Sequence, residues 1–122
     1  MMDEYRKGWA LRCLREAIDE VKIAKRDSRA LSLAIDALRK AQAAIYYSLG
    51  EPFLIGSIVE EAVESETQPD DPVLRCLVSV EKSIKRLEQM REIYGDAAVV
   101  EETDKIVSLA SRIVSLLTSL ED

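Results

Sequence analysis

Apolar residues recur every three or four positions along almost the whole 122-residue chain, and this spacing constrains the fold more than any other feature. An α-helix has 3.6 residues per turn, so this spacing gathers apolar side chains on one helix face. No segment alternates apolar and polar residues for long enough to predict a strand. The sequence therefore predicts an all-α protein.

The same pattern predicts four long helices, separated by residues that favour helix ends. Asp3 can cap the first helix, and Asp71 followed by Pro72 is typical of the start of the third. Gly95 suits the end of that helix, and Asp96 can cap the last one. We expect these helices to form two hairpins.

Between the hairpins, residues 49–72 hold all three prolines and the only phenylalanine. Pro52 fits the first position of a short helix that we expect to end near Glu66. One side of this helix is rich in apolar residues, which predicts an interface between copies of the chain. The predicted interface residues are Phe53, Leu54, Ile55, Ile58, Val59 and Ala62.

The tetrapeptide LRCL occurs at residues 11–14 and 74–77, each time early in a long helix that precedes a turn and a second long helix. Either a hairpin was duplicated or leucine-rich helices resemble each other by composition, and both interpretations stay open.

We expect a single helical-bundle domain over residues 1–122, long enough to bury a core. It consists of a hairpin over 1–50, an acidic crossover over 51–71 and a hairpin over 72–122. Four long helices and one short crossover helix predict an up-and-down bundle. The crossover can pack on its own bundle or be exchanged between chains in a segment-swapped dimer.

Charge is distributed unevenly between these parts. The chain has 17 basic and 23 acidic residues, a net charge of −6, and the segments 1–50, 51–71 and 72–122 carry +3, −7 and −2. An acidic total without a basic cluster argues against binding to a nucleic acid. The opposite signs of the crossover and the first hairpin favour docking of one on the other, within a chain or between two.

The chain contains no histidine, which excludes Ser/His/Asp and Cys/His nucleophile pairs and the Glu-x-x-His site of di-iron bundles. Cys13 and Cys76 lie on apolar helix faces without a CxxC partner, so we expect buried thiols and no zinc. No apolar run approaches membrane-spanning length and the start does not resemble a signal peptide, so we expect a cytoplasmic protein. The lack of asparagine and the few glutamines favour a thermophilic source.

Two acidic groups at helical spacing offer an alternative function. Glu60-Glu61-x-x-Glu64 resembles the first part of the metal-binding pattern of MazG-type nucleotide pyrophosphohydrolases, and Glu101-x-x-Asp104 resembles the second. That resemblance implies magnesium as a cofactor and hydrolysis of a nucleotide. In this chain, however, a whole helix separates the two parts.

The segment YYSLGEPFLIGSIVEEAV, residues 46–63, resembles the turn and acidic helix of HEPN-type bundles. The ribonuclease motif of that family is an arginine followed about five residues later by histidine, whereas Arg91 is followed at that distance by Asp96. The resemblance therefore implies only a non-catalytic role in binding a protein partner.

Length, acidity and helix order are also similar to those of small, uncharacterised archaeal helical-bundle proteins, some of which form segment-swapped dimers. That similarity implies a fold and a mode of assembly but no activity. From the sequence we favour a non-enzymatic interaction protein that self-associates, as a homodimer or a higher oligomer. The magnesium-dependent hydrolase and the HEPN-like partner protein are the alternatives.

Overall fold

The computed structural model describes residues 3–27, 30–66 and 68–120 of the chain. These residues form helices and connecting segments and contain no strand, so the all-α prediction is confirmed. The helices are α1 (Glu4–Arg26), α2 (Leu31–Leu49), α3 (Pro52–Glu64), α4 (Pro72–Tyr94) and α5 (Asp96–Leu120).

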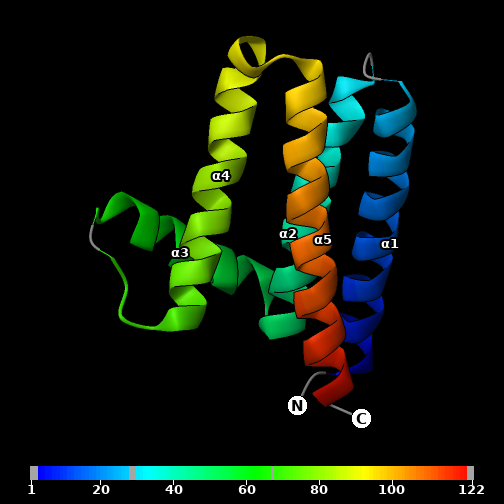
Figure 1. The fold of residues 1–122 in the computed structure, drawn as a ribbon. Coiled ribbons are helices and arrows are strands. Elements are labelled where there is room, and N and C mark those ends of the chain that lie inside the picture. The colour runs from blue at the N-terminus through cyan, green and yellow to red at the C-terminus, as the bar shows by residue number, and fades with distance from the viewer. Residues whose placement is uncertain (1–2, 28–29, 67, 121–122) are drawn as a thin grey trace.

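The four long helices run alternately up and down, and both ends of the chain lie at the same end of the bundle (Figure 1). α2 and α5 form the middle of the bundle and contact each other; α1 packs on one side of this pair and α4 on the other. The short α3 crosses α4 and also contacts the end of α2. The predicted up-and-down bundle with a crossover helix is therefore confirmed.

The helix ends follow their local sequence. The Asp3 carboxylate accepts a 2.7 Å hydrogen bond from the backbone N–H of Arg6, and that of Asp71 accepts one of 2.8 Å from Val73. These two predicted caps are therefore confirmed, whereas Asp96 is the first residue of α5 rather than its cap. Gly95, between α4 and α5, has a φ of +81°, the left-handed conformation that glycine adopts without strain.

α2 and α3 are separate helices. Gly50 ends α2 with an extended backbone, at φ 173°, so it does not adopt the left-handed conformation typical of a glycine that ends a helix. Pro52 begins α3, as predicted, and the Glu51 carboxylate caps it by accepting a 3.1 Å hydrogen bond from the N–H of Phe53.

Small residues fill much of the core, and this explains the close packing of α1, α2 and α5. Most alanines of these helices are almost completely shielded from water, and small side chains let helix axes approach closely. Larger buried side chains complete the core, among them Leu38, Ile45, Ile84, Val99 and Val114. Leu14 and Leu77, from the two LRCL segments, are both buried.

The sequence also led us to expect buried cysteines and no membrane-spanning segment. Cys13 and Cys76 are free and only half-buried. No helix in the described part of the chain combines the length and the apolar character needed to cross a membrane.

Candidate functional site

α3 is held against the bundle by one face. Val59 is fully buried, and Ile55 and Ala62 are half-buried against the core. Gly56 lies over Tyr46 of α2, and a Cβ at this position would be 3.7 Å from the tyrosine ring. This is an ordinary van der Waals distance, so α3 and α2 are in direct contact at Gly56 and an alanine would also fit there.

The opposite face of α3 exposes large apolar side chains. Phe53 is 84% exposed, Leu54 58% and Ile58 43%. The structure therefore divides the six predicted interface residues, because Ile55, Val59 and Ala62 pack against their own chain. We call the exposed set Phe53, Leu54 and Ile58 the apolar edge of α3.

Acidic side chains accompany this edge. Glu60 forms an ion pair with Lys85 of α4 at 3.1 Å, which fastens α3 to its neighbour. Glu61 and Glu64 are exposed and form no ion pair with any side chain that the structure describes. All three glutamates line a pocket of about 480 Å³ between α3 and the side chains of Tyr46 and Glu81.

The second acidic group lies elsewhere. Asp104 of α5 forms an ion pair with Lys25 of α1 at 2.9 Å, and Glu101 is exposed one turn earlier. Over their described lengths α3 and α5 do not contact each other, so the two groups are not brought together. Within residues 3–27, 30–66 and 68–120, no group of three or more Asp, Glu or Cys side chains is arranged to hold a metal ion.

A buried polar network joins α2 to α4 beneath α3. Arg39 donates to both carboxylate oxygens of Glu88, at 2.7 and 3.0 Å, and to Glu81 at 2.9 Å. Gln42 donates to Glu81 and to the hydroxyl oxygen of Tyr46, the latter at 3.0 Å. Glu81 is only 4% exposed, so these bonds replace the water that it would have on the surface.

Burial, followed by the negative charge of Glu81, raises the pKa of Tyr46 to about 12. The hydroxyl therefore stays protonated near neutral pH. Its hydrogen bond with Gln42 serves to order α2 beneath α3.

A further polar cluster joins α1 to α2. The Lys40 ammonium lies 3.0 to 3.1 Å from carboxylate oxygens of Glu16, Glu20 and Asp36. Hydrogen bonds to these three carboxylates raise the pKa of Lys40. Sequence reasoning missed this cluster, because its members come from two helices and share no motif. The available signal was the acidic pair Glu16 and Glu20, one turn apart on a helix that packs against the helix of Lys40.

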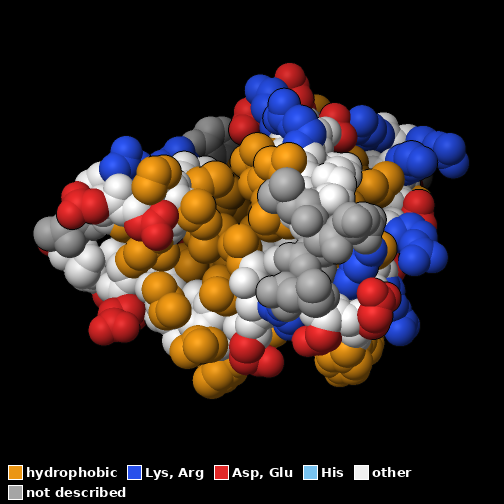
Figure 2. Space-filling view, turned by 90° about the horizontal axis from the view of Figure 1, so that it is seen from below, with side chains coloured by type: hydrophobic (Ala, Val, Ile, Leu, Met, Phe, Trp, Pro, Cys, Tyr) orange, Lys and Arg blue, Asp and Glu red, His pale blue; other side chains and the backbone are white. Residues whose placement is uncertain are grey.

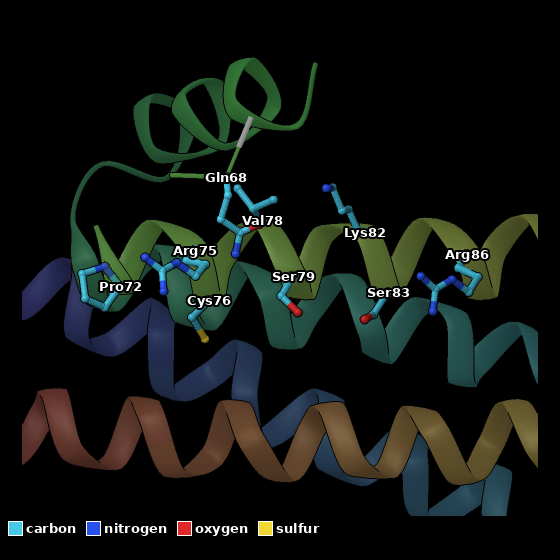
Figure 3. A pocket seen from close by; sticks show the side chains of 9 residues that line it. All are labelled: Gln68, Pro72, Arg75, Cys76, Val78, Ser79, Lys82, Ser83 and Arg86. Atoms are coloured by element: carbon cyan, nitrogen blue, oxygen red, sulfur yellow. The ribbon is translucent and has the colours of Figure 1, made fainter. Parts of the chain in front are cut away.

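The outer face of α4 carries a row of basic residues. Arg75, Lys82 and Arg86, which we call the basic stripe, line a groove of about 600 Å³ together with the small side chains of Ser79 and Ser83 (Figure 3). The Arg75 guanidinium donates to backbone carbonyls of the segment before α4, at 3.1 and 3.2 Å. Lys82 and Arg86 form no ion pair among the described residues.

An apolar pocket of about 300 Å³ opens at the end of the bundle where α4 begins, between α2, α4 and α5. Seen from this end, hydrophobic side chains gather in a hollow (Figure 2). Val73 and Leu116 at this pocket are 53% and 61% exposed. The complete lining is Ile45, Leu49, Pro72, Val73, Cys76, Leu77, Ile113, Leu116 and Leu117.

The apolar edge of α3, the basic stripe and the apolar pocket are thus three surfaces in the described part of the chain that offer contacts to another molecule. Comparisons with known proteins found no match: no protein-family model, no curated protein and no solved structure is significantly similar to this chain.

Proposed function

We propose that this protein is an interaction protein that self-associates as a dimer, with the apolar edge of α3 in the interface. The observation that carries this proposal is the exposure of Phe53, Leu54 and Ile58 on one short helix whose other face is docked. Single exposed apolar residues are ordinary on protein surfaces, but several large ones on one short helix are typical of interaction sites.

The energetics favour covering this edge. Removing a large apolar side chain from water contributes roughly 1.5–3 kcal/mol, and an exposed aromatic ring that enters a pocket is typical of the residues that dominate binding energy. Among the large apolar residues whose exposure the structure describes, Phe53 has the highest value, so it is the best candidate for such an anchor.

Light scattering coupled to size exclusion tests the proposal. We expect the native chain to have twice the 13.7 kDa mass of one chain and Ile58→Glu to have the mass of a single chain. Ile23→Glu is the matched control, because Ile23 is 47% exposed on α1 and lies outside α3. Circular dichroism of each variant checks that the helices are retained.

A native chain that remains a monomer at every accessible concentration would overturn the proposal. So would a dimer that Ile23→Glu and Ile58→Glu disrupt equally.

The magnesium-dependent hydrolase makes a different prediction. It requires that Mg²⁺ or Mn²⁺ raise the melting temperature and that Glu61→Gln remove the effect, because a ligand that binds only the native state stabilises it. Under the interaction proposal neither ion changes the melting temperature by more than a general salt effect, and Glu61→Gln behaves like the native chain.

A further inference from the structure

We propose that the surface that receives α3 is the basic stripe and apolar pocket of α4 in a second copy of this chain, so that each subunit inserts its α3 onto the α4 of the other. This inference rests on the proposed self-association and names both sides of the contact.

The area available shows that α3 cannot provide the interface alone. The exposed parts of Phe53, Leu54 and Ile58 amount to on the order of 300 Å². A stable interface buries roughly 800 Å² on each partner. If each subunit both inserts its α3 and receives that of the other, each partner buries its own pocket and basic stripe in addition to its apolar edge.

Charge selects which surfaces can meet. Residues 51–71 carry seven acids and no base, so two copies of α3 repel each other. Two copies of the basic stripe also repel each other. The α3 helix of one copy against the stripe of the other brings Glu61 and Glu64 to Lys82 and Arg86, four charged side chains that have no ion pair within the described part of their own chain.

The order of apolar and charged residues is the same on both helices. α3 begins with Phe53 and Leu54 and ends with its acids, whereas α4 begins at the apolar pocket and carries Lys82 and Arg86 further along. With 1.5 Å per residue, Phe53 to Glu61 spans about 12 Å, and Pro72, which lines both the pocket and the groove, lies about 15 Å from Lys82 along α4. A parallel alignment therefore places the phenylalanine beside Pro72 at the rim of the pocket and the acids at the stripe.

The receiving surface is continuous and open to a close approach. The apolar pocket and the groove of the basic stripe share Pro72 and Cys76. Ser79 and Ser83 lie in the groove between the cations, and their small side chains leave room for a helix (Figure 3).

Charge reversal on each side tests the pairing. One chain carries Lys82→Glu and Arg86→Glu, and the other carries Glu61→Lys and Glu64→Lys. Each chain alone places like charges at both contacts, so we expect its dimer to dissociate at least tenfold more readily than the native dimer. In an equimolar mixture both contacts regain opposite charges, so we expect a heterodimer, identified by its mass in native mass spectrometry. Reversal of Arg15 and Lys22, exposed bases of α1, is the matched control and should leave the dimer unchanged.

The outcomes separate this inference from the proposed function. A native monomer overturns both. This inference alone is overturned if the native chain is a dimer and either reversal leaves that dimer intact. It is also overturned if the two variants are folded monomers that do not combine on mixing. If a double reversal lowers the helical content, the test is repeated with the single changes Lys82→Glu and Glu61→Lys. The inference is overturned if the mixture of these two variants dimerises no more strongly than each variant alone.

Discussion

Glu81 occupies a core position, where the helical spacing of α4 would favour an apolar residue. It is tolerated because Arg39 and Gln42 of the facing helix bond to its carboxylate. Without Arg39, the buried Glu81 carboxylate would keep as partners only Gln42 and the more distant Lys85 ammonium, 3.7 Å away.

We therefore expect Arg39→Met to lower the free energy of unfolding by about 1–2 kcal/mol, because Arg39 is itself partly exposed and Lys85 remains near Glu81. Adding Glu81→Leu should recover most of the loss, because the double variant leaves no buried charge at this position. Urea denaturation of the native chain, both single variants and the double variant measures the coupling.

Lys105→Met is the control for this cycle, since the ion pair of Lys105 with Glu102 is exposed. We expect a much smaller change there, because solvent screens the pair. An Arg39→Met variant no less stable than Lys105→Met would contradict the role given to the network.

Single residues also show where sequence reasoning reaches its limit. Helical spacing placed Phe53 and Val59 on one predicted interface, but the first is 84% exposed and the second is fully buried. Spacing predicts that a helix has an apolar side, not how far round the helix its own chain covers. The polar network was hidden for a related reason: Arg39 and Glu81 are far apart in sequence and meet only when α2 packs on α4.

At the scale of elements, the helix ends were the most predictable features. Asp3, Asp71 and Pro72 act through hydrogen bonds and dihedral preferences within a few residues, so their effect does not depend on the tertiary fold. The position of α3 was not predictable in this way. It contacts α2 of the first hairpin, as the opposite charges of the two segments favoured, but it also docks on α4, where Glu60 pairs with Lys85.

Replacing glycine by alanine should have opposite effects on stability at residues 95 and 8. Gly95 has a positive φ, so Gly95→Ala should cost about 1 kcal/mol of stability even though open space surrounds the site. Gly8 lies within α1 and also has open space around it, so Gly8→Ala should add about 0.5–1 kcal/mol. Chemical denaturation of the two variants side by side measures both changes. A gain in stability at residue 95 would show that the turn between α4 and α5 does not need the left-handed conformation.

The whole molecule combines a tightly packed side with a more open one. Alanine-lined contacts join α1, α2 and α5, whereas the apolar pocket remains between α2, α4 and α5 at the end of the bundle. The all-α class and the up-and-down order followed from apolar spacing alone. The pocket did not, because it depends on the angle at which α4 leaves its neighbours. The exposed apolar residues and unpaired charges described above thus lie on α3 and α4, the two helices furthest from the tightly packed side.

The salt dependence of dimerisation should show whether charge pairs contribute to the interface. If acids of α3 meet the basic stripe of a second copy, raising NaCl from 0.05 to 0.5 M should weaken the dimer by about tenfold, because ions screen exposed charge pairs. Sedimentation equilibrium at each salt concentration measures the dissociation constant. The variant with Glu61→Gln and Glu64→Gln should form a weaker dimer whose dissociation constant depends little on salt, because the apolar edge then provides most of the contact. A native dimer that tightens as salt is added would instead identify an interface made by the apolar surfaces alone, with the basic stripe left in solvent.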